Sequence, residues 1–269
     1  MSWFSKYNSE KHGNRYRRWL LKAAMPILLI FLWELVAIVI NNQFILPRLE
    51  SVLMVIASPF TPILGTGSLV DNAIISLERV IVGFAVGSVI AIPLGIAMGR
   101  WALVHDLFDS LIQIFRPVPP LAWVPLALAW FKIGLTSMVF IIALGTFFPV
   151  LLNTLDGVRS VKKTWIEMAA ILGANELQML RTVVLPAALP TIWTGLRVGF
   201  GIAWMCVVAA EMMPGTSSGL GYLILYSYNF GQVPVIIAGM IGIGVIGLGV
   251  DLLLGTVEKR WFMWRELER

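Results

Sequence analysis

The sequence predicts an all-α integral membrane protein with about six transmembrane helices. Apolar residues make up 58% of its 269 residues and charged residues only 13%, whereas soluble domains average about 45–50% apolar and about 25% charged residues. Several apolar runs reach about 20 residues, the length that an α-helix needs to cross the hydrocarbon core of a bilayer. Most lysines and arginines lie in alternate segments between these runs, which is typical of a chain that crosses a membrane several times.

The apolar runs give the predicted spans in chain order. The first starts near Ala23 and is too long for the apolar region of a cleavable signal peptide. The third is the shortest, and Pro117, Pro119 and Pro120 crowd its start; membrane helices tolerate proline where neighbouring groups satisfy the freed carbonyls. A short helix is expected at Ser51–Ala57, in the loop after the first span. The predicted spans are residues 23–40, 74–98, 117–131, 135–155, 189–212 and 233–256.

The distribution of basic residues orients these spans. If the N-terminus is cytoplasmic, only Arg48 and Lys132 of the basic residues between spans lie outside the cell. Because cytoplasmic loops of membrane proteins are enriched in lysine and arginine, both termini are expected in the cytoplasm. The chain then divides into a basic and aromatic N-terminal segment, a transmembrane domain with a cytoplasmic loop at about 160–186, and a C-terminal tail. Their ranges are 1–22, 23–257 and 258–269.

Composition and motifs argue against several other classes of protein. The net charge is +5, but no basic face follows a soluble nucleic-acid-binding motif, so nucleic acid is not an expected partner. The histidines His12 and His105 stand far apart without metal-ligand spacing, and neither a metal nor an organic cofactor is expected. The sequence contains no nucleotide-binding P-loop and no nucleophile–base pair, so the chain is not expected to be an enzyme.

The cytoplasmic loop between the fourth and fifth spans predicts two short helices. Thr164 and Glu167 have the spacing of a capping box. Gly173 is expected to end the first helix with a positive φ, which glycine adopts cheaply. Asn175 is a candidate N-cap for the second helix, and Leu185–Pro186 is expected to end it.

This loop resembles the EAA loop of binding-protein-dependent ABC importer permeases. The resemblance rests on Glu167-Met-Ala-Ala-Ile-Leu-Gly173 followed by Val184-Leu-Pro186, although Met168 stands where the motif has alanine. The stretch Arg116-Pro-Val-Pro-Pro-Leu-Ala-Trp-Val-Pro125 resembles the taurine, sulfonate and nitrate permease branch of that family, as do Trp130–Gly134, Gly195-Leu-Arg197 and Ala209-Ala-Glu211. The resemblance covers about residues 70–257.

The resemblance implies the type I ABC importer permease fold and a subunit that forms the translocation pathway of a small solute. The solute would be an anion such as taurine, another sulfonate, nitrate or bicarbonate. The implied partners are cytoplasmic ATPase subunits that hydrolyse ATP, a second permease copy and an extracytoplasmic solute-binding protein, all assembled at the inner, cytoplasmic cell membrane. The loop residues implied to couple this chain to the ATPase are Glu167, Ala169, Ala170, Gly173, Ala174, Leu185 and Pro186.

Charged residues inside predicted spans are the candidates for intramembrane pairs or for the solute pathway. Each is costly in hydrocarbon unless it is paired. With a helical rise of about 1.5 Å per residue, Glu34 and Arg79 are expected at similar depths in the membrane, and so are Arg197 and Asp251. Two ion pairs are therefore expected. Alternatively Arg197 contacts the solute, since a guanidinium suits oxyanions. Arg116, at the edge of the third span, is a further pathway candidate.

The residues alone leave two questions open, the role of the stretch 214–222 and the class of the protein. The glycine-rich stretch 214–222 is expected either to line an outer gate or to contact a solute-binding protein, with Glu211, Gly219 and Gly221 as candidates, or to be a flexible loop. The membrane-embedded carboxylates Glu34 and Asp251 are also compatible with a secondary transporter driven by an ion gradient. A membrane scaffold without transport is the other alternative.

Overall fold

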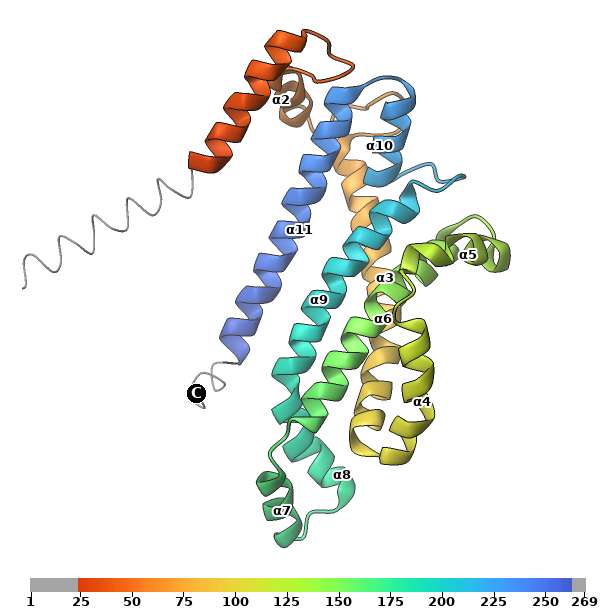
Figure 1. Ribbon diagram of the computed structural model, residues 1–269, viewed down its shortest axis with the longest axis vertical. Helices are drawn as coiled ribbons and strands as arrows, with labels where there is room; N and C mark the ends of the chain where they lie inside the picture. The colour runs from red at the N-terminus through yellow and green to blue at the C-terminus, as the bar shows by residue number, and fades with distance from the viewer. Residues whose placement is uncertain (1–23, 263–269) are drawn as a thin grey trace, which may run out of the picture. The chain divides into compact units, whose positions relative to one another are not determined.

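The computed structural model describes residues 24–262, and every regular element in this range is a helix (Figure 1). The expected cytoplasmic segment 1–22 and most of the tail 258–269 lie outside the described residues. The chain falls into two compact units, which we describe separately. The smaller comprises residues up to Ser58 together with Ser227–Ala238, and the larger comprises Pro59–Tyr226 together with the chain from Gly239 onward.

Three long helices form the core of the larger unit: α3 (Leu69–Arg100), α6 (Leu135–Arg159) and α9 (Leu185–Glu211). Small residues allow their backbones to approach closely. Gly83 packs against Ile142 and Gly95 against Thr154, so α3 and α6 run parallel. Helix α9 runs antiparallel to α6, with Gly145 against Cys206 and Gly157 against Ala188.

A bent helical segment returns the chain between the two parallel helices. It consists of α4 (Ala102–Phe115), the 3₁₀ turn η1 (Pro120–Trp123) and α5 (Val124–Phe131), and the two parts meet at 86°. The prediction of a third span at 117–131 was therefore wrong in shape and extent. The prolines before η1 cannot donate the backbone hydrogen bonds that would continue α4. Because α3 and α6 run parallel, this segment is a broken crossing.

Four helices of residues 24–262 are long and apolar enough to cross a membrane, and five if the bent pair counts as one crossing. They are α3, α6, α11 (Val233–Trp261) and the continuous helix Glu176–Glu211 that contains α9. The helix Ala24–Ile40 is a further, shorter apolar helix. The long helices extend beyond the predicted spans: α3 starts at Leu69, where Ser68 and Asp71 form a capping box that the sequence analysis missed.

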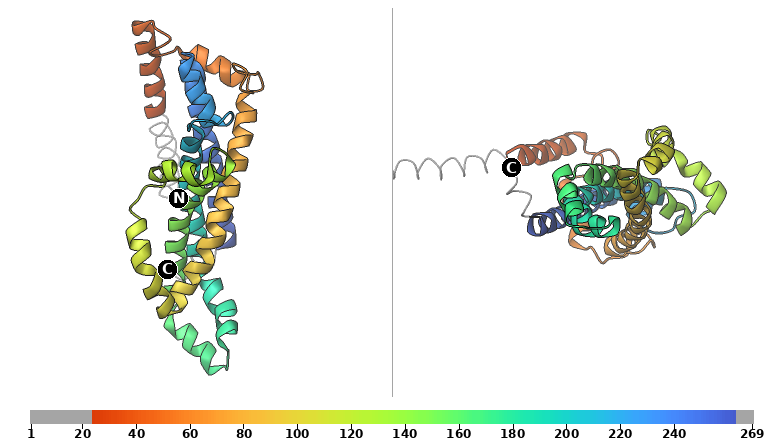
Figure 2. Two further views of the ribbon diagram at one scale, coloured as in Figure 1. Left: turned by 90° about the vertical axis from the view of Figure 1, so that its right-hand side faces the viewer. Right: turned by 90° about the horizontal axis from the view of Figure 1, so that it is seen from below.

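Two short helices project from the end of the core at which α6 ends and α9 begins (Figures 1 and 2). They are α7 (Lys163–Ile171) and α8 (Glu176–Met179). A π-helical turn, η2 (Leu180–Val184), joins α8 to α9 without a break. The prediction that Leu185–Pro186 ends the second short helix was therefore wrong. The wider π turn accommodates a proline that lacks the donor of an i→i−4 bond.

The smaller unit contains the helix Ala24–Ile40, a turn, and α2 (Leu49–Ala57), which confirms the expected short helix in this loop. The helix α10 (Leu220–Asn229) begins in the larger unit and ends in the smaller one.

Candidate functional site

The two short helices form a hairpin, defined as residues Lys163–Pro186 and called here the inner hairpin after the side of the membrane on which the sequence predicts it. Its turn is a Schellman cap, in which Gly173 N donates to Ala170 O and Ala174 N donates to Ala169 O, both at 3.0 Å. Gly173 has a φ of +80°, as predicted from the sequence. An added Cβ at this residue would meet no atom within 4 Å, so the backbone conformation alone demands glycine.

The second arm of the hairpin begins at the predicted N-cap. Asn175 Oδ1 accepts a hydrogen bond from Gln178 N, and Gln178 Oε1 accepts one from Asn175 N, both at 2.9 Å. This reciprocal capping box fixes the direction in which α8 leaves the turn. Arg100, the last residue of α3, reaches Glu176 of the same arm at 3.2 Å.

The first arm starts differently from the prediction. Its N-cap is Lys162, and no side chain caps it, so the expected box of Thr164 and Glu167 does not form. Thr164 already lies inside the first turn, where its hydroxyl cannot reach the free amides of the helix start. Glu167 is exposed and faces Lys163 at 3.9 Å, and exposed pairs of this kind contribute little. Its carboxylate is therefore free to meet another chain.

An apolar groove of about 430 Å³ separates α7 from the start of α9. Trp165, Met168 and Ala169 line one wall, and Val183 and Pro186 the other. At the tip, the side chains of Ile171 and Leu172 are 84% and 86% exposed. No residue of α7 is buried. An exposed apolar surface on a helix without buried residues is typical of a site that contacts another protein or a membrane.

The second cluster lies at the other end of the core and surrounds Glu211, which is fully buried. Ser76 Oγ lies 2.8 and 2.9 Å from the two carboxylate oxygens, Arg79 Nη1 donates at 2.9 Å, and Gly221 N donates at 3.0 Å. A buried carboxylate with a cationic partner and several donors is fully compensated. We call this set, with Ser218, the outer cluster, again after the side of the membrane on which the sequence predicts it.

The outer cluster also fixes the loop before α10. Arg79 binds the carbonyl and the hydroxyl of Ser218 at 2.7 and 2.8 Å. Gly219 has a φ of +106°, and a Cβ there would collide with the Glu211 carboxylate. Gly221 approaches the backbone of Val208 too closely for any side chain. The glycines of this loop thus allow a close approach to Glu211.

One expectation needs correction at this cluster. Arg79 was predicted to pair with Glu34, but its carboxylate partner is Glu211, and Glu34 instead accepts a hydrogen bond from Leu49 N at 2.9 Å. Glu211, a candidate for the outer gate or for contact with a solute-binding protein, is fully buried in this structure. Sequence reasoning also missed Ser76. Its signal was a polar stripe on α3, since Ser76 and Arg79 share one face of the helix.

A pocket of about 460 Å³ opens beside the outer cluster. Its lining includes Glu78 and Arg79 of α3, Leu135 of α6 and Ser217 of the loop. Arg79 is thus partly accessible, although its guanidinium is already neutralised by Glu211.

The third cluster joins α9 to α11. Arg197 Nε and Nη2 donate to the two oxygens of Asp251 at 2.6 and 2.8 Å, and Nη1 donates to Glu258 at 3.3 Å. The structure therefore brings Arg197 and Asp251 together and adds Glu258, which the sequence analysis did not identify. Asp251 and Glu258 are seven residues apart, two helical turns, which was the available signal. Arg116 follows α4, is exposed, and has no ion-pair partner within residues 24–262.

The described residues contain no group of three or more side chains suited to hold a metal ion.

The chain matches, over residues 91–263, a family model described as "Binding-protein-dependent transport system inner membrane component".

Several named proteins are similar to this chain over most of its length. A protein named as a putative ABC transporter permease of Methanocaldococcus jannaschii is 56% identical over 92% of each chain. The taurine transport system permease protein of Escherichia coli is 35% identical over 96% of each chain. The nitrate import permease protein of a Synechocystis strain is 36% identical over 68% of this chain and 66% of its own length.

A solved structure shares the fold. A chain of the MetNI methionine ABC transporter in inward-facing conformations matches with a TM-score of 0.58, covering 71% of this chain and 93% of its own. At 19% identity the match supports the fold alone.

Proposed function

The chain belongs to the family of binding-protein-dependent transport system inner membrane components, and from this membership we infer how its three sites work in transport. The protein is a multi-pass permease subunit of an ABC transporter. It forms the membrane pathway of an importer for a small anion such as taurine, another sulfonate, nitrate or bicarbonate. The relatives named for taurine and nitrate transport support this solute class.

The inner hairpin is the coupling element to a separate ATPase subunit. The observation that carries this proposal is the exposed apolar tip on a hairpin that continues without a break into the helix Glu176–Glu211. Movement of a partner bound to the tip would therefore move the helix Glu176–Glu211, which reaches the opposite end of the core. The contacts proposed for the partner are Glu167, Ala169, Ala170, Gly173, Ala174, Leu185 and Pro186.

The outer cluster is the proposed outer gate. Glu211 lies at the far end of the helix that starts in the hairpin, and its carboxylate holds α3 and the loop before α10. Rotation or tilting of this helix would pull Glu211 away from Arg79 and Gly221. A buried, fully satisfied ion pair that must break on opening gives the gate two discrete states.

We propose that Arg197 links α9 to α11 and does not contact the solute directly. Two carboxylates already occupy its guanidinium, so an anionic solute would have to displace at least one of them. This link would carry the movement of α9 to α11.

The complete importer is proposed to contain two ATPase subunits, a second permease copy and an external solute-binding protein. The complex is proposed to lie in the inner membrane of the cell, with both termini of this chain in the cytoplasm. The test is uptake of labelled taurine and nitrate into proteoliposomes that contain the assembled complex. Vanadate, which traps ATPases, should abolish uptake, and ionophores that collapse ion gradients should not. Uptake that resists vanadate and stops with ionophores would instead assign the chain to secondary transport.

A further inference from the structure

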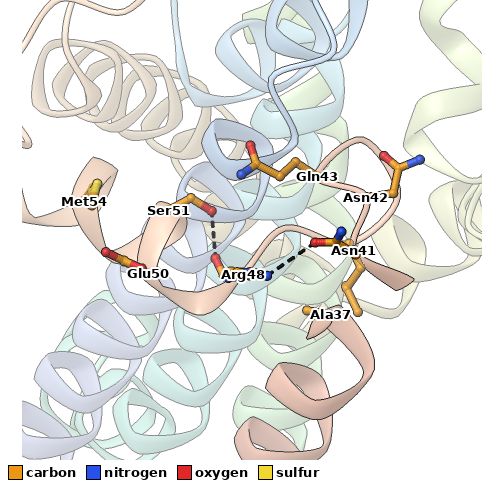
Figure 3. A pocket seen from close by; sticks show the side chains of 9 residues that line it. Ala37, Asn41, Asn42, Gln43, Arg48, Glu50, Ser51 and Met54 are labelled. Atoms are coloured by element: carbon orange, nitrogen blue, oxygen red, sulfur yellow. Dashed lines mark hydrogen bonds between the residues drawn. The ribbon is translucent and has the colours of Figure 1, made fainter. Parts of the chain in front are cut away.

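The smaller unit contains a polar pocket at the C-terminal end of the helix Ala24–Ile40. The pocket measures about 410 Å³ and lies between the turn after this helix and the start of α2 (Figure 3). Most of the residues that line it are polar or charged. They comprise Asn41, Asn42 and Gln43 from the turn and Arg48, Glu50 and Ser51 from the start of α2.

The walls of this pocket are fixed by bonds to the apolar helix. Trp33 Nε1 donates to Pro47 O at 3.0 Å, and Glu34 Oε2 accepts from Leu49 N at 2.9 Å. Leu49 is the first residue of α2, whose N-cap has no side-chain acceptor of its own. The Glu34 carboxylate thus caps α2 from a neighbouring helix, at the positive end of the α2 dipole. This role accounts for an acidic residue within an apolar helix.

Both signs of charge face the pocket without being neutralised. Arg48 makes one side-chain hydrogen bond, from Nη2 to Asn41 Oδ1 at 3.3 Å, which Figure 3 marks. Within residues 24–262, neither Arg48 nor Glu50 has an ion-pair partner. The remaining guanidinium N–H groups and the side-chain amides are donors for an oxyanion, and the Glu50 carboxylate is an acceptor for a cation.

The position of the pocket along the chain matches the membrane surface. The helix Ala24–Ile40 is apolar apart from Glu34, and three consecutive amide side chains follow its end. The end of an apolar membrane helix lies where hydrocarbon gives way to headgroups. Apolar Ala37, Leu46 and Met54 complete the lining, so the pocket offers apolar surface for an acyl glycerol together with polar groups for a charged headgroup.

We propose that this pocket binds the headgroup of a zwitterionic phospholipid, with the phosphate on Arg48 and the ammonium group on Glu50. Phosphatidylethanolamine has this chemistry. An anionic lipid without an ammonium group, such as phosphatidylglycerol, would satisfy Arg48 but leave Glu50 facing a like charge. The bound lipid would bridge the helix Ala24–Ile40 and α2 at the membrane surface.

The test measures lipid retention by the purified full-length protein with native mass spectrometry, after exchange into either phosphatidylethanolamine or phosphatidylglycerol. Arg48→Gln should lower phosphatidylethanolamine retention about tenfold, because it removes a charged donor. Glu50→Gln should remove the preference for phosphatidylethanolamine over phosphatidylglycerol. Arg116→Gln, at an exposed arginine outside the pocket, should change neither. Both pocket side chains are exposed, and unchanged melting temperatures verify that the variants fold.

Two results would overturn the proposal. The first is wild-type retention of phosphatidylethanolamine by Arg48→Gln. The second is displacement of the lipid by inorganic phosphate or glycerophosphoethanolamine at about the concentration of the lipid, which would assign the pocket to a soluble anion. Persistence of the lipid against a large excess of both soluble compounds supports a membrane lipid as the occupant.

Discussion

Replacing Gly173 by valine should uncouple the permease from its ATPase without unfolding it. The residue has a φ of +80° in a Schellman cap, and an added side chain would enter open space. The whole penalty is therefore conformational, about 1–2 kcal/mol for an ordinary L-residue and more for a β-branched one. A penalty of this size lowers the ratio of native to altered turns about 5- to 30-fold. The affinity for the ATPase should fall by up to the same factor.

The assay is ATP hydrolysis by the complex reconstituted in lipid, with and without loaded solute-binding protein, alongside recovery of ATPase subunits on an affinity-tagged permease. Gly173→Val should lose most of the stimulated hydrolysis and of the recovered ATPase. Gly173→Asn should stay within about twofold of the wild type, since asparagine tolerates the left-handed conformation.

Gly65 provides a matched control for this experiment. It has a φ of +79°, an added Cβ there meets no atom within 4 Å, and it lies in the loop before α3. Gly65→Val therefore carries the same backbone penalty far from the hairpin and should leave stimulated hydrolysis unchanged. Normal hydrolysis and uptake in Gly173→Val would refute the coupling role of the hairpin. An equal loss in Gly65→Val would show that the effect is general destabilisation.

Three other predictions follow from the clusters and the topology. Glu211→Leu should lower the unfolding free energy by about 3–5 kcal/mol, because it strands the Arg79 guanidinium; adding Arg79→Met should recover most of the loss in thermal unfolding, and an additive double variant would contradict the pair. Arg197→Met should cost about 1 kcal/mol in the same measurement while the Kd of solute for the complex stays constant; a selective loss of solute binding would favour a direct contact. In a cysteine-free background, a cysteine at Lys163 should react with an impermeant reagent only from the cytoplasm and one at Ser217 only from outside, and the reverse pattern would invert the topology.

Local features of the hairpin were predictable from the sequence, while its start was not. Gly173 and the Asn175 box depend on residues within a few positions of each other, and both are present. The box expected at Thr164 failed because the backbone already turns at Lys162, one residue before α7. There the Lys162 ammonium lies 5.2 Å from the centre of the Trp165 ring, a contact that capping rules do not consider.

Helix α4 and the outer cluster were harder to predict for different reasons. Helix α4 carries the ionisable residues His105, Asp106 and Asp109 among its apolar residues, so a search for continuous apolar runs passes over it. The Arg79–Glu211 pair joins residues 132 positions apart, and depth arithmetic alone assigned Arg79 to another carboxylate. Several acceptors at a similar depth are equivalent until the packing of the helices is known.

The separation of Arg79 and Glu211 also bears on how the protein is made. At about 5–20 residues per second, roughly 7–26 s pass between synthesis of the arginine and synthesis of its carboxylate partner. During this interval α3 enters the membrane with a guanidinium that has no counter-ion from its final partner. Its parallel neighbour α6 also arrives late, since it is completed only at Arg159. Nascent α3 should therefore be held by the insertion machinery, or with Arg79 at the lipid surface, until α9 is synthesised.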